Sequence, residues 1–428
     1  MKLYVSPAKT NGELCVPGSK SHTIRAVVVA TLAKGKSVIE APLVSDDTLS
    51  CLKAASTFGA WVKRGAGDAF WEITGTGGRL LTPAKTVDMG NSGTGTRLFT
   101  ALAALGDSPV FFDGDDSLRT RPMAPLLDAL RSLGAKATST DGKCPCSVQG
   151  PIIGGEAFVN GKSSQFVSAL LMAAPLAKIN TILLVQNPNE TPYIEMTLDW
   201  LKQTGIQVTH DSRYMHFALK GGQAYTPFER KIPGDFSTAC FPLVAAAVTC
   251  GKIQLHNLDF KDSQGDKAIF DYLKKMGASI TVSRHGITTV KGGPLKAVEL
   301  DLNATPDALP IMAVAAACAE GTSVFRNVAQ ARIKETDRIA CMATELRKMG
   351  IKVEEFEDGM AVTGGKLQAS KELESYKDHR IVMALAIAAL AVKNQSAVSI
   401  INDAEAAAVT YPGFVNDFRN LGAKFQLN

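Results

Sequence analysis

The chain has 428 residues, of which 46% are hydrophobic and 20% charged. This composition excludes a disordered protein, a collagen-like repeat and a small disulfide-stabilised domain, and the length predicts about two or three domains. The formal net charge of +5 is too weak to indicate a nucleic-acid partner, although it leaves anionic small molecules open.

The sequence shows neither a secretory signal nor a membrane span. Residues 1–7 lack the apolar core and the cleavage site of a secretory signal. The longest apolar stretches, such as residues 381–392, are shorter than the ~20 residues that a membrane span needs. The spacing of Cys144 and Cys146 does not fit a zinc knuckle. We therefore expect a cytoplasmic protein with reduced cysteines, no membrane segment and no metal site.

Two landmarks recur along the whole chain. One is a glycine that follows a helical run and precedes a strand, at Gly59, Gly134, Gly205, Gly277, Gly350 and Gly422. The other is a polar cluster that opens an alanine-rich helix, at Ser21, Gly93, Ser164, Ser237, Asp307 and Asp378. The intervals lie between 70 and 75 residues in both series. Because two independent landmarks keep one period, we infer six repeats that fill the chain.

Each repeat has the pattern of a βαβαββ unit, and the third shows the order of elements. A polar N-cap opens an apolar helix over residues 164–172, and a β-branched strand follows at 181–185. An amphipathic helix over residues 193–203 and the glycine step then lead into a hairpin over 207–219.

The first helix of every repeat is almost uniformly apolar, in segments 26–33, 99–105, 166–174, 241–248, 311–319 and 381–392. A helix that is apolar all round is buried on all sides, so we predict three buried helices inside a ring of sheets in each half. A strand at residues 3–5 can complete the last repeat across from Phe425. We predict a first domain of residues 15–232 and a discontinuous second domain of residues 1–14 plus 233–428.

The helix starts of the first half combine glycines, hydroxyls and cations, in segments 17–25, 90–97 and 161–165. Helix N-termini carry free N–H groups and about half a positive charge, so several together predict an anion receptor. One such turn alone is often structural, and residues 90–97 match neither a P-loop nor a dinucleotide-binding turn. Three in register favour a ligand site.

The helix starts of the second half carry acids and an imidazole, at Asp235, Asp307, Asp378, His379 and Arg380. An aspartate at an N-cap is ordinarily only a cap, and this interpretation stays open for Asp235 and Asp378. A run of charged residues at 332–338 precedes the second helix of the fifth repeat, and it is either a solvated surface or part of a site. In the second case Lys334 and Arg338, four residues apart, share one helical face, with Glu335 beside them.

These segments resemble the EPSP synthases (3-phosphoshikimate 1-carboxyvinyltransferases) of the enolpyruvyl transferase family, over essentially the whole chain. The motifs are Pro17-Gly18-Ser19-Lys20-Ser21 with Arg25, Gly90-Asn91-Ser92-Gly93-Thr94, Arg119-Thr120-Arg121-Pro122, Ser163-Ser164-Gln165-Phe166, Lys334-Glu335-Thr336-Asp337-Arg338 and Asp378-His379-Arg380. The resemblance implies an α/β fold of two inside-out α/β barrel domains, each of three βαβαββ repeats.

The resemblance also implies a reaction and its residues. The enolpyruvyl group of phosphoenolpyruvate would pass to the 5-hydroxyl of shikimate 3-phosphate through a tetrahedral ketal, with loss of phosphate, in the shikimate pathway of aromatic amino acid biosynthesis. Shikimate 3-phosphate would bind Lys20, Ser21, Arg25, Ser163, Ser164, Gln165, Asp307, Gln330 and Lys334. Phosphoenolpyruvate would bind Lys20, Asn91, Gly93, Arg121, Gln165, Arg338 and Arg380. The implied catalytic residues are Asp307 as base, Glu335 as acid, Lys20 and His379. No cofactor or metal is required, and we expect a monomer.

Some positions depart from the family pattern. Val409 stands where the family often has a lysine that binds phosphoenolpyruvate. A serine that is usual before the Pro-Tyr of the third repeat is replaced within residues 189–193. Glu190 would repel a phosphate there, so either Thr191 takes the part of the serine or the loop differs. The turn at Gly93 also has unusual neighbours, which leaves the response to the inhibitor glyphosate open.

Three alternatives remain beside this interpretation. The sister enolpyruvyl transferase that acts on UDP-N-acetylglucosamine typically has a cysteine in the loop before its Arg-Pro, and the loop before Arg121 has none. A non-catalytic scaffold or nucleic-acid binder would need an extended basic face with exposed aromatics, whereas aromatics make up 7% of the chain and lie mostly in apolar runs. A catalytically impaired family member is the third alternative, because of Val409.

Overall fold

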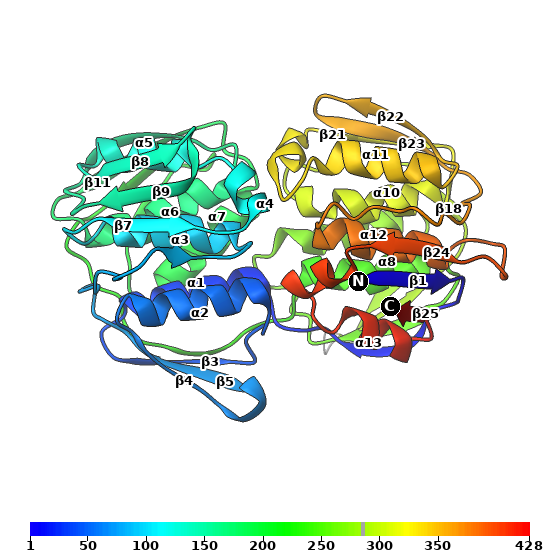
Figure 1. The fold of residues 1–428 in the computed structure, drawn as a ribbon, viewed down its shortest axis with the longest axis horizontal. Helices are drawn as coiled ribbons and strands as arrows, with labels where there is room; N and C mark the ends of the chain where they lie inside the picture. Colours follow the sequence, from blue (N-terminus) through cyan, green and yellow to red (C-terminus); the bar gives the residue numbers. More distant parts are fainter. Residues whose placement is uncertain (284–286) are drawn as a thin grey trace. The chain divides into compact units, whose positions relative to one another are not determined.

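The computed structural model describes residues 1–283 and 287–428. The chain forms two compact units, Gly18–Ile232 and Met1–Pro17 with Pro233–Asn428 (Figure 1). The first boundary therefore differs from the predicted one, which followed residue 14. The reason is that strand β2 (Asn11–Cys15) pairs in parallel with β15 (Lys252–His256), so Cys15 belongs to the unit of β15.

The unit Gly18–Ile232 contains three four-stranded sheets, one per repeat, with the strand orders β14-β3-β5-β4, β6-β7-β9-β8 and β10-β11-β13-β12. Its strands are β3 (Lys36–Glu40), β4 (Trp61–Arg64), β5 (Phe70–Thr74), β6 (Val87–Asp88), β7 (Val110–Asp113), β8 (Lys136–Thr140), β9 (Lys143–Gln149), β10 (Gly155–Asn160), β11 (Thr181–Gln186), β12 (Val208–His210), β13 (His216–Leu219) and β14 (Glu229–Lys231). In each sheet one parallel pair is extended by an antiparallel hairpin. Strand β14 follows the third repeat in sequence and completes the sheet of the first, which closes the unit on itself.

The helices of this unit divide into buried and amphipathic ones. They are α1 (Lys20–Leu32), α2 (Asp46–Thr57), α3 (Gly93–Ala103), α4 (Asp116–Thr120), α5 (Ala124–Ser132), α6 (Ser164–Ala173) and α7 (Thr191–Gln203). Nearly every side chain of α1, α3 and α6 is buried, and α3 contacts both of the other two. Figure 1 shows α1 and α2 side by side along the sheet of β3, β4 and β5. The three apolar helices are therefore the core of the unit, as predicted.

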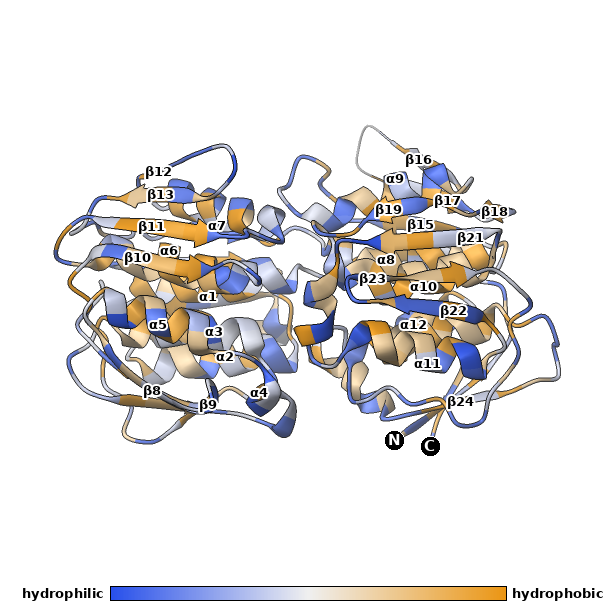
Figure 2. Cartoon of the chain, turned by 90° about the horizontal axis from the view of Figure 1, so that it is seen from above, coloured by the Kyte–Doolittle hydropathy of each residue, from blue (hydrophilic) through white to orange (hydrophobic). Residues whose placement is uncertain are grey.

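The other unit has two four-stranded sheets of this kind, β16-β17-β15-β2 and β19-β21-β23-β22, a three-stranded sheet β24-β1-β25 and a two-stranded sheet β18-β20. Its strands are β1 (Lys2–Ser6), β2, β15, β16 (Ser279–Val282), β17 (Thr288–Lys291), β18 (Leu295–Lys296), β19 (Glu299–Asp301), β20 (Ala319–Glu320), β21 (Thr322–Arg326), β22 (Lys352–Phe356), β23 (Gly359–Thr363), β24 (Ser399–Asn402) and β25 (Lys424–Leu427). Its helices are α8 (Phe236–Val248), α9 (Ala268–Lys275), α10 (Leu309–Ala317), α11 (Arg338–Lys348), α12 (His379–Leu390) and α13 (Phe414–Asn420). Helices α8, α10 and α12 are buried almost throughout and contact one another. In Figure 2, α10 and α12 are coloured hydrophobic along most of their length.

The N-terminal strand belongs to the last repeat. Strand β1 lies between β24 and β25 and is antiparallel to both. Val5 pairs with Phe425 across the β1–β25 register, which confirms the predicted pairing. The two chain ends accordingly lie close together in Figure 1.

The glycine landmark marks the end of the second helix in every repeat. All six glycines have a positive φ: Gly59 (99°), Gly134 (102°), Gly205 (85°), Gly277 (100°), Gly350 (80°) and Gly422 (92°). A left-handed residue after the last helical turn ends a helix, and only glycine adopts that conformation without strain. The glycines that recur in the sequence thus mark the ends of six equivalent helices. No helix in the described ranges is long and apolar enough to cross a membrane.

Candidate functional site

The start of α1 holds a lysine fixed by a carboxylate. The α1 N-terminus is capped by Ser19, whose side chain accepts a hydrogen bond from the backbone N–H of His22. Lys20, the first residue of the helix, donates from Nζ to Oδ2 of Asp47 on α2 at 3.0 Å. Both side chains are largely buried, at 16% and 4% exposure. Asp47 orients the lysine, and nothing in the local sequence indicated this long-range pair.

Arg25 lies one turn further along α1 and is fully buried. Its Nε donates to Oγ1 of Thr197 at 2.8 Å, and Nη1 donates to the carbonyl of Ser21 at 3.1 Å. Its Nη2 donates to Oγ of Ser168 and to the carbonyl of Tyr193. Burial lowers the pKa of Arg25 to about 10, so the guanidinium stays charged at neutral pH. These contacts join α1 to α6 and α7 and hold a positive charge behind the helix starts.

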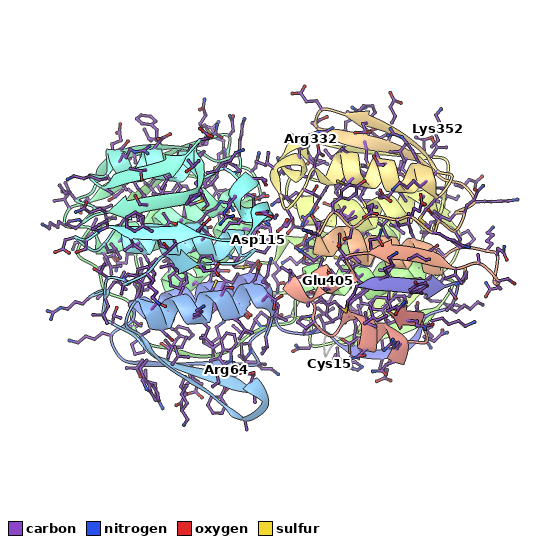
Figure 3. The ribbon with its side chains drawn as sticks, in the orientation of Figure 1. Cys15, Arg64, Asp115, Arg332, Lys352 and Glu405 are labelled. Atoms are coloured by element: carbon purple, nitrogen blue, oxygen red, sulfur yellow. The ribbon has the colours of Figure 1, made fainter. Side chains whose placement is uncertain are left out.

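The start of α3 positions a second arginine. Arg121 donates from Nη2 to Oδ1 of Asn91 at 2.7 Å and from Nη1 to the Asn91 carbonyl at 3.1 Å. The amide of Asn91 donates in turn to Asp115, which caps α4 and is labelled in Figure 3. The chain Asp115–Asn91–Arg121 therefore fixes both predicted phosphoenolpyruvate ligands of this loop relative to each other.

Gly93 makes room for two guanidinium groups. A Cβ at this position would lie 2.6 Å from Nη1 of Arg121 and 2.8 Å from Nη1 of Arg97. Such distances are too short for any real side chain, so only glycine allows both arginines to approach the start of α3. Arg97 belongs to the predicted anion-binding segment 90–97 but was not among the predicted ligands. Its signal was its position one helical turn after Gly93.

The starts of α3 and α6 are brought together by a side-chain contact. Arg97 donates from Nη1 to Oε1 of Gln165 at 2.7 Å, and its guanidinium lies 5.2 Å from the ring centre of Phe166. At the α6 N-terminus the Ser163 side chain accepts from the Gln165 N–H at 3.4 Å. Ser164 is buried and donates to Glu190. This unit therefore collects the cations and hydroxyls that an anionic ligand needs.

In the other unit the charged residues surround Asp307, in the short 3-10 turn Pro306–Ala308 before α10. Its Oδ1 accepts a hydrogen bond from Nη1 of Arg338 at 2.8 Å and lies 3.7 Å from Nζ of Lys334. Its Oδ2 lies 3.2 Å from Nη2 of Arg380. Two repeats thus contribute to one cluster, because Asp307, Lys334 and Arg338 belong to the fifth repeat and Arg380 begins the first helix of the sixth.

Arg338 is the centre of this cluster and is 1% exposed. Besides Asp307 it donates from Nη2 to Oε2 of Glu335 at 2.6 Å. It also forms two hydrogen bonds with Asp378, the N-cap of α12. Burial would lower the pKa of Arg338, but Asp378, Glu335 and Asp307 raise it further above its ordinary value. The guanidinium is a permanent charge held by three carboxylates.

The acidity of Asp307 follows from the same contacts. Burial alone would raise the pKa of this carboxyl, but Arg380, Lys334 and Arg338 outweigh burial and hold the pKa well below its ordinary value. Asp307 is therefore ionised and weakly basic while these three cations face it.

One predicted arrangement in this region is wrong. Lys334 and Arg338 were expected on one face of a helix, but residues 329–333 form a 3-10 turn and α11 begins only at Arg338. Asp337 caps α11 by accepting from the Ala340 N–H at 3.0 Å, so the residues before it are outside the helix. Both cations still reach Asp307, from the turn and from the helix start respectively.

The remaining predicted residues take peripheral or buried positions. His379 is the first residue of α12 and is 1% exposed. Gln330 lies on the 3-10 turn and donates from Nε2 to the Asn303 carbonyl at 3.0 Å. Val409 ends a 3-10 turn, Ala404–Val409, and is half-buried. Within residues 1–283 and 287–428 no three His, Cys, Asp or Glu side chains are arranged to hold a metal ion.

Comparison with known proteins decides the family. The family model described as EPSP synthase (3-phosphoshikimate 1-carboxyvinyltransferase) matches residues 5–418. The chain belongs to the EPSP synthase family. It is 45% identical over 426 residues to the 3-phosphoshikimate 1-carboxyvinyltransferase of Acetivibrio thermocellus, with 99% of each chain covered. It is 44% identical over 434 residues to that of Methanosarcina acetivorans, covering 100% of this chain and 99% of the other.

Solved structures agree with this assignment. The EPSP synthase of Acinetobacter baumannii matches 100% of both chains with a TM-score of 0.82 and 29% identity. The enolpyruvyl transferase NikO of Streptomyces tendae shares the fold alone, with a TM-score of 0.79 and 17% identity over 99% of this chain and 98% of the other. The predicted α/β fold of two enolpyruvyl transferase-like domains is confirmed.

Proposed function

We propose that this protein transfers the enolpyruvyl group of phosphoenolpyruvate to the 5-hydroxyl of shikimate 3-phosphate, releasing phosphate. The observation that carries the proposal is the whole-chain family match combined with the family's motif residues at the starts of the buried helices. The reaction is a step of the shikimate pathway, which leads to aromatic amino acids. We place the protein in the cytoplasm and expect it to be a monomer.

The unit Gly18–Ile232 supplies groups that bind anions. Ser163, Ser164 and the N-terminus of α6 suit the acceptor's phosphate, because hydroxyls and free helix N–H groups donate to phosphate oxygens. Arg121 and Lys20 suit the phosphoenolpyruvate anions, because a guanidinium binds carboxylate or phosphate bidentately and an ammonium adds a point charge. The remaining ligands proposed from this unit are Ser21, Arg25, Asn91, Gly93 and Gln165.

The other unit supplies the groups that move protons. Asp307 takes the proton of the 5-hydroxyl, while Gln330 and Lys334 hold the acceptor and Arg338 and Arg380 hold the donor. Asp307 is a weak base while three cations face it. Anionic substrate groups on Arg338 and Arg380 would offset those charges and raise the pKa of Asp307. Substrate binding thereby turns a structural carboxylate into a general base.

The donor must also gain a proton at its methylene carbon, C3. Glu335 is the proposed acid, and its contact with Arg338 at 2.6 Å keeps it beside the same guanidinium as Asp307. A donor bound to this guanidinium would lie next to the Glu335 carboxyl. Lys20 and His379 are the further proposed catalytic residues. The hydroxyl then attacks C2 while Asp307 takes its proton. The resulting ketal expels phosphate as C3 returns a proton to Glu335, which restores the C2–C3 double bond of the enolpyruvyl group.

One assay tests the proposal. Purified protein is incubated with phosphoenolpyruvate and either shikimate 3-phosphate or UDP-N-acetylglucosamine, and phosphate release is followed. We expect release with shikimate 3-phosphate only. Release with the sugar nucleotide alone would assign the sister activity. No release with either acceptor at millimolar substrate would overturn the proposal and favour the catalytically impaired family member.

A further inference from the structure

Glu190 joins the starts of two helices. It precedes α7 with a left-handed backbone, φ 55° and ψ 39°, and its carbonyl accepts from the Tyr193 N–H at 3.0 Å. Its side chain turns to the start of α6, where Oε2 accepts from the Ser164 N–H at 3.1 Å and from Ser164 Oγ at 2.7 Å. Glu190 and Ser164 are each 1% exposed. The carboxylate is thus a built-in anion at a helix N-terminus.

The donors that Glu190 uses are those proposed for the acceptor's phosphate. A phosphate bound to Ser164 would need the same N–H and the same hydroxyl, each of which directs its hydrogen at a single place. A carboxylate oxygen 2.7 Å from Oγ leaves no space for a phosphate oxygen there. The two anions also repel each other. The phosphate and the Glu190 carboxylate therefore exclude one another at this position.

We propose that Glu190 is a specificity-determining residue that competes with the acceptor's phosphate for Ser164. The inference rests on the proposed function. Phosphate binding requires the Glu190 side chain to rotate away from α6, because its backbone is fixed at the start of α7. The enzyme therefore binds the phosphorylated acceptor less tightly than its other contacts allow, and it discriminates less between that acceptor and its unphosphorylated form.

Two substitutions separate the charge of this residue from its size. Glu190→Gln keeps the length and an acceptor oxygen for Ser164 but removes the charge. Glu190→Ser removes the charge and also shortens the side chain. The α6 start is then left open, while Ser163 still caps the helix. The matched control is Glu195→Gln on the same helix, because Glu195 pairs with Tyr214 in an exposed contact away from α6.

The test measures dissociation constants by calorimetry for shikimate 3-phosphate, for unphosphorylated shikimate and for inorganic phosphate. We expect Glu190→Ser to bind shikimate 3-phosphate at least about tenfold more tightly than the unaltered protein, and Glu190→Gln to fall between them. Shikimate affinity should change less than about twofold, and Glu195→Gln should change neither constant. Thermal unfolding of each variant shows whether it is folded.

The inference fails if both folded Glu190 variants bind the two acceptors with unchanged affinity. It also fails if they lose affinity for both by the same factor, since Glu190 would then support the site only. The proposed function is tested separately. If the Glu190 variants change binding as expected but the unaltered protein releases no phosphate, the proposed reaction is wrong and the competition between Glu190 and the acceptor's phosphate still holds. If the unaltered protein turns over normally but the Glu190 variants bind both acceptors with unchanged affinity, the reaction stands and the competition is wrong.

Discussion

Arg338 and Asp378 form a buried ion pair with two hydrogen bonds, from Nε to Oδ2 at 2.8 Å and from Nη2 to Oδ1 at 3.2 Å. Neither side chain is more than 1% exposed. Asp378 also caps α12 by accepting from the Arg380 N–H at 2.8 Å, so one carboxylate orients two of the cations that face Asp307. The helix cap and the site share this residue.

Asp378→Asn should lower the free energy of unfolding by about 3 kcal/mol, because it removes one partner of a buried pair and leaves the other charge poorly compensated. Urea unfolding measures the change. The control is Glu299→Gln, which breaks the exposed pair between Glu299 and Arg326 and should cost less than ~1 kcal/mol. Equal changes in the two variants would contradict a structural role for the Arg338–Asp378 pair.

Asp307→Asn should lower kcat by at least ~100-fold, because the hydroxyl loses its general base. The dissociation constant of shikimate 3-phosphate should rise by less than about fivefold, since the amide still offers an oxygen to a ligand hydroxyl. Steady-state kinetics and calorimetry on the same preparation give both values. Losses of similar size in kcat and affinity would reduce Asp307 to a binding residue.

The fold was predictable because glycines and apolar segments recur at the same position in every repeat, and each of them has one structural role. Glycine is needed wherever a helix ends in the left-handed conformation, and all six landmark glycines have positive φ. An apolar helix has no exposed face, so six such segments identified the six inner helices. The β1–β25 pairing followed from the position left open in the last repeat.

The contacts among the candidate site residues could not be predicted from the sequence. Lys20 and Asp47 lie on different helices, and no local pattern links them. The helical spacing of Lys334 and Arg338 was misleading because Asp337 caps a helix that begins only at Arg338. Glu190 was recognised as a charge near a phosphate position, but its contact with Ser164 depends on a left-handed backbone that its residue type does not favour.

Glu345 should stabilise the turn that leads to Asp378. It is fully buried on α11 and accepts from the Tyr376 hydroxyl at 2.7 Å and from the Glu374 N–H at 3.0 Å. Tyr376 and Lys377 both have a left-handed backbone, with φ of 55° and 57°, which side-chain-bearing residues adopt only when held. Tyr376→Phe removes a hydrogen bond to a charged group and should cost about 1.5–3 kcal/mol in urea unfolding.

The control for this variant is Tyr214→Phe, which removes the same kind of bond, to Glu195, in an exposed place. It should cost less than ~1 kcal/mol. Hydrogen exchange supplies a second readout, because Tyr376→Phe should speed exchange at the amides of residues 374–378. Unchanged exchange there would show that the turn holds its conformation without Glu345.

The low pKa of Asp307 predicts how its contribution to stability depends on pH. The unfolded carboxyl takes up a proton near its ordinary pKa of about 4, whereas the folded one stays ionised to much lower pH. Between those values the unfolded state binds more protons, so stability falls as pH falls. The difference in unfolding free energy between the unaltered protein and Asp307→Asn should therefore shrink below about pH 4. A difference that grows toward acid would reverse the sign of the inferred pKa shift.

Gly93→Ala should weaken donor binding more than it weakens the fold. The new Cβ would meet only the far ends of Arg97 and Arg121, at 2.8 and 2.6 Å, and these flexible side chains can move aside. The folding cost should stay below ~1 kcal/mol, while the KM for phosphoenolpyruvate should rise by about tenfold because Arg121, a proposed ligand of the donor, is displaced from its contacts with Asn91. Gly293→Ala is the control, since nothing lies within 4 Å of its Cβ position. An unchanged KM in Gly93→Ala would mean that Arg121 binds the donor from a position other than the one it occupies beside this glycine.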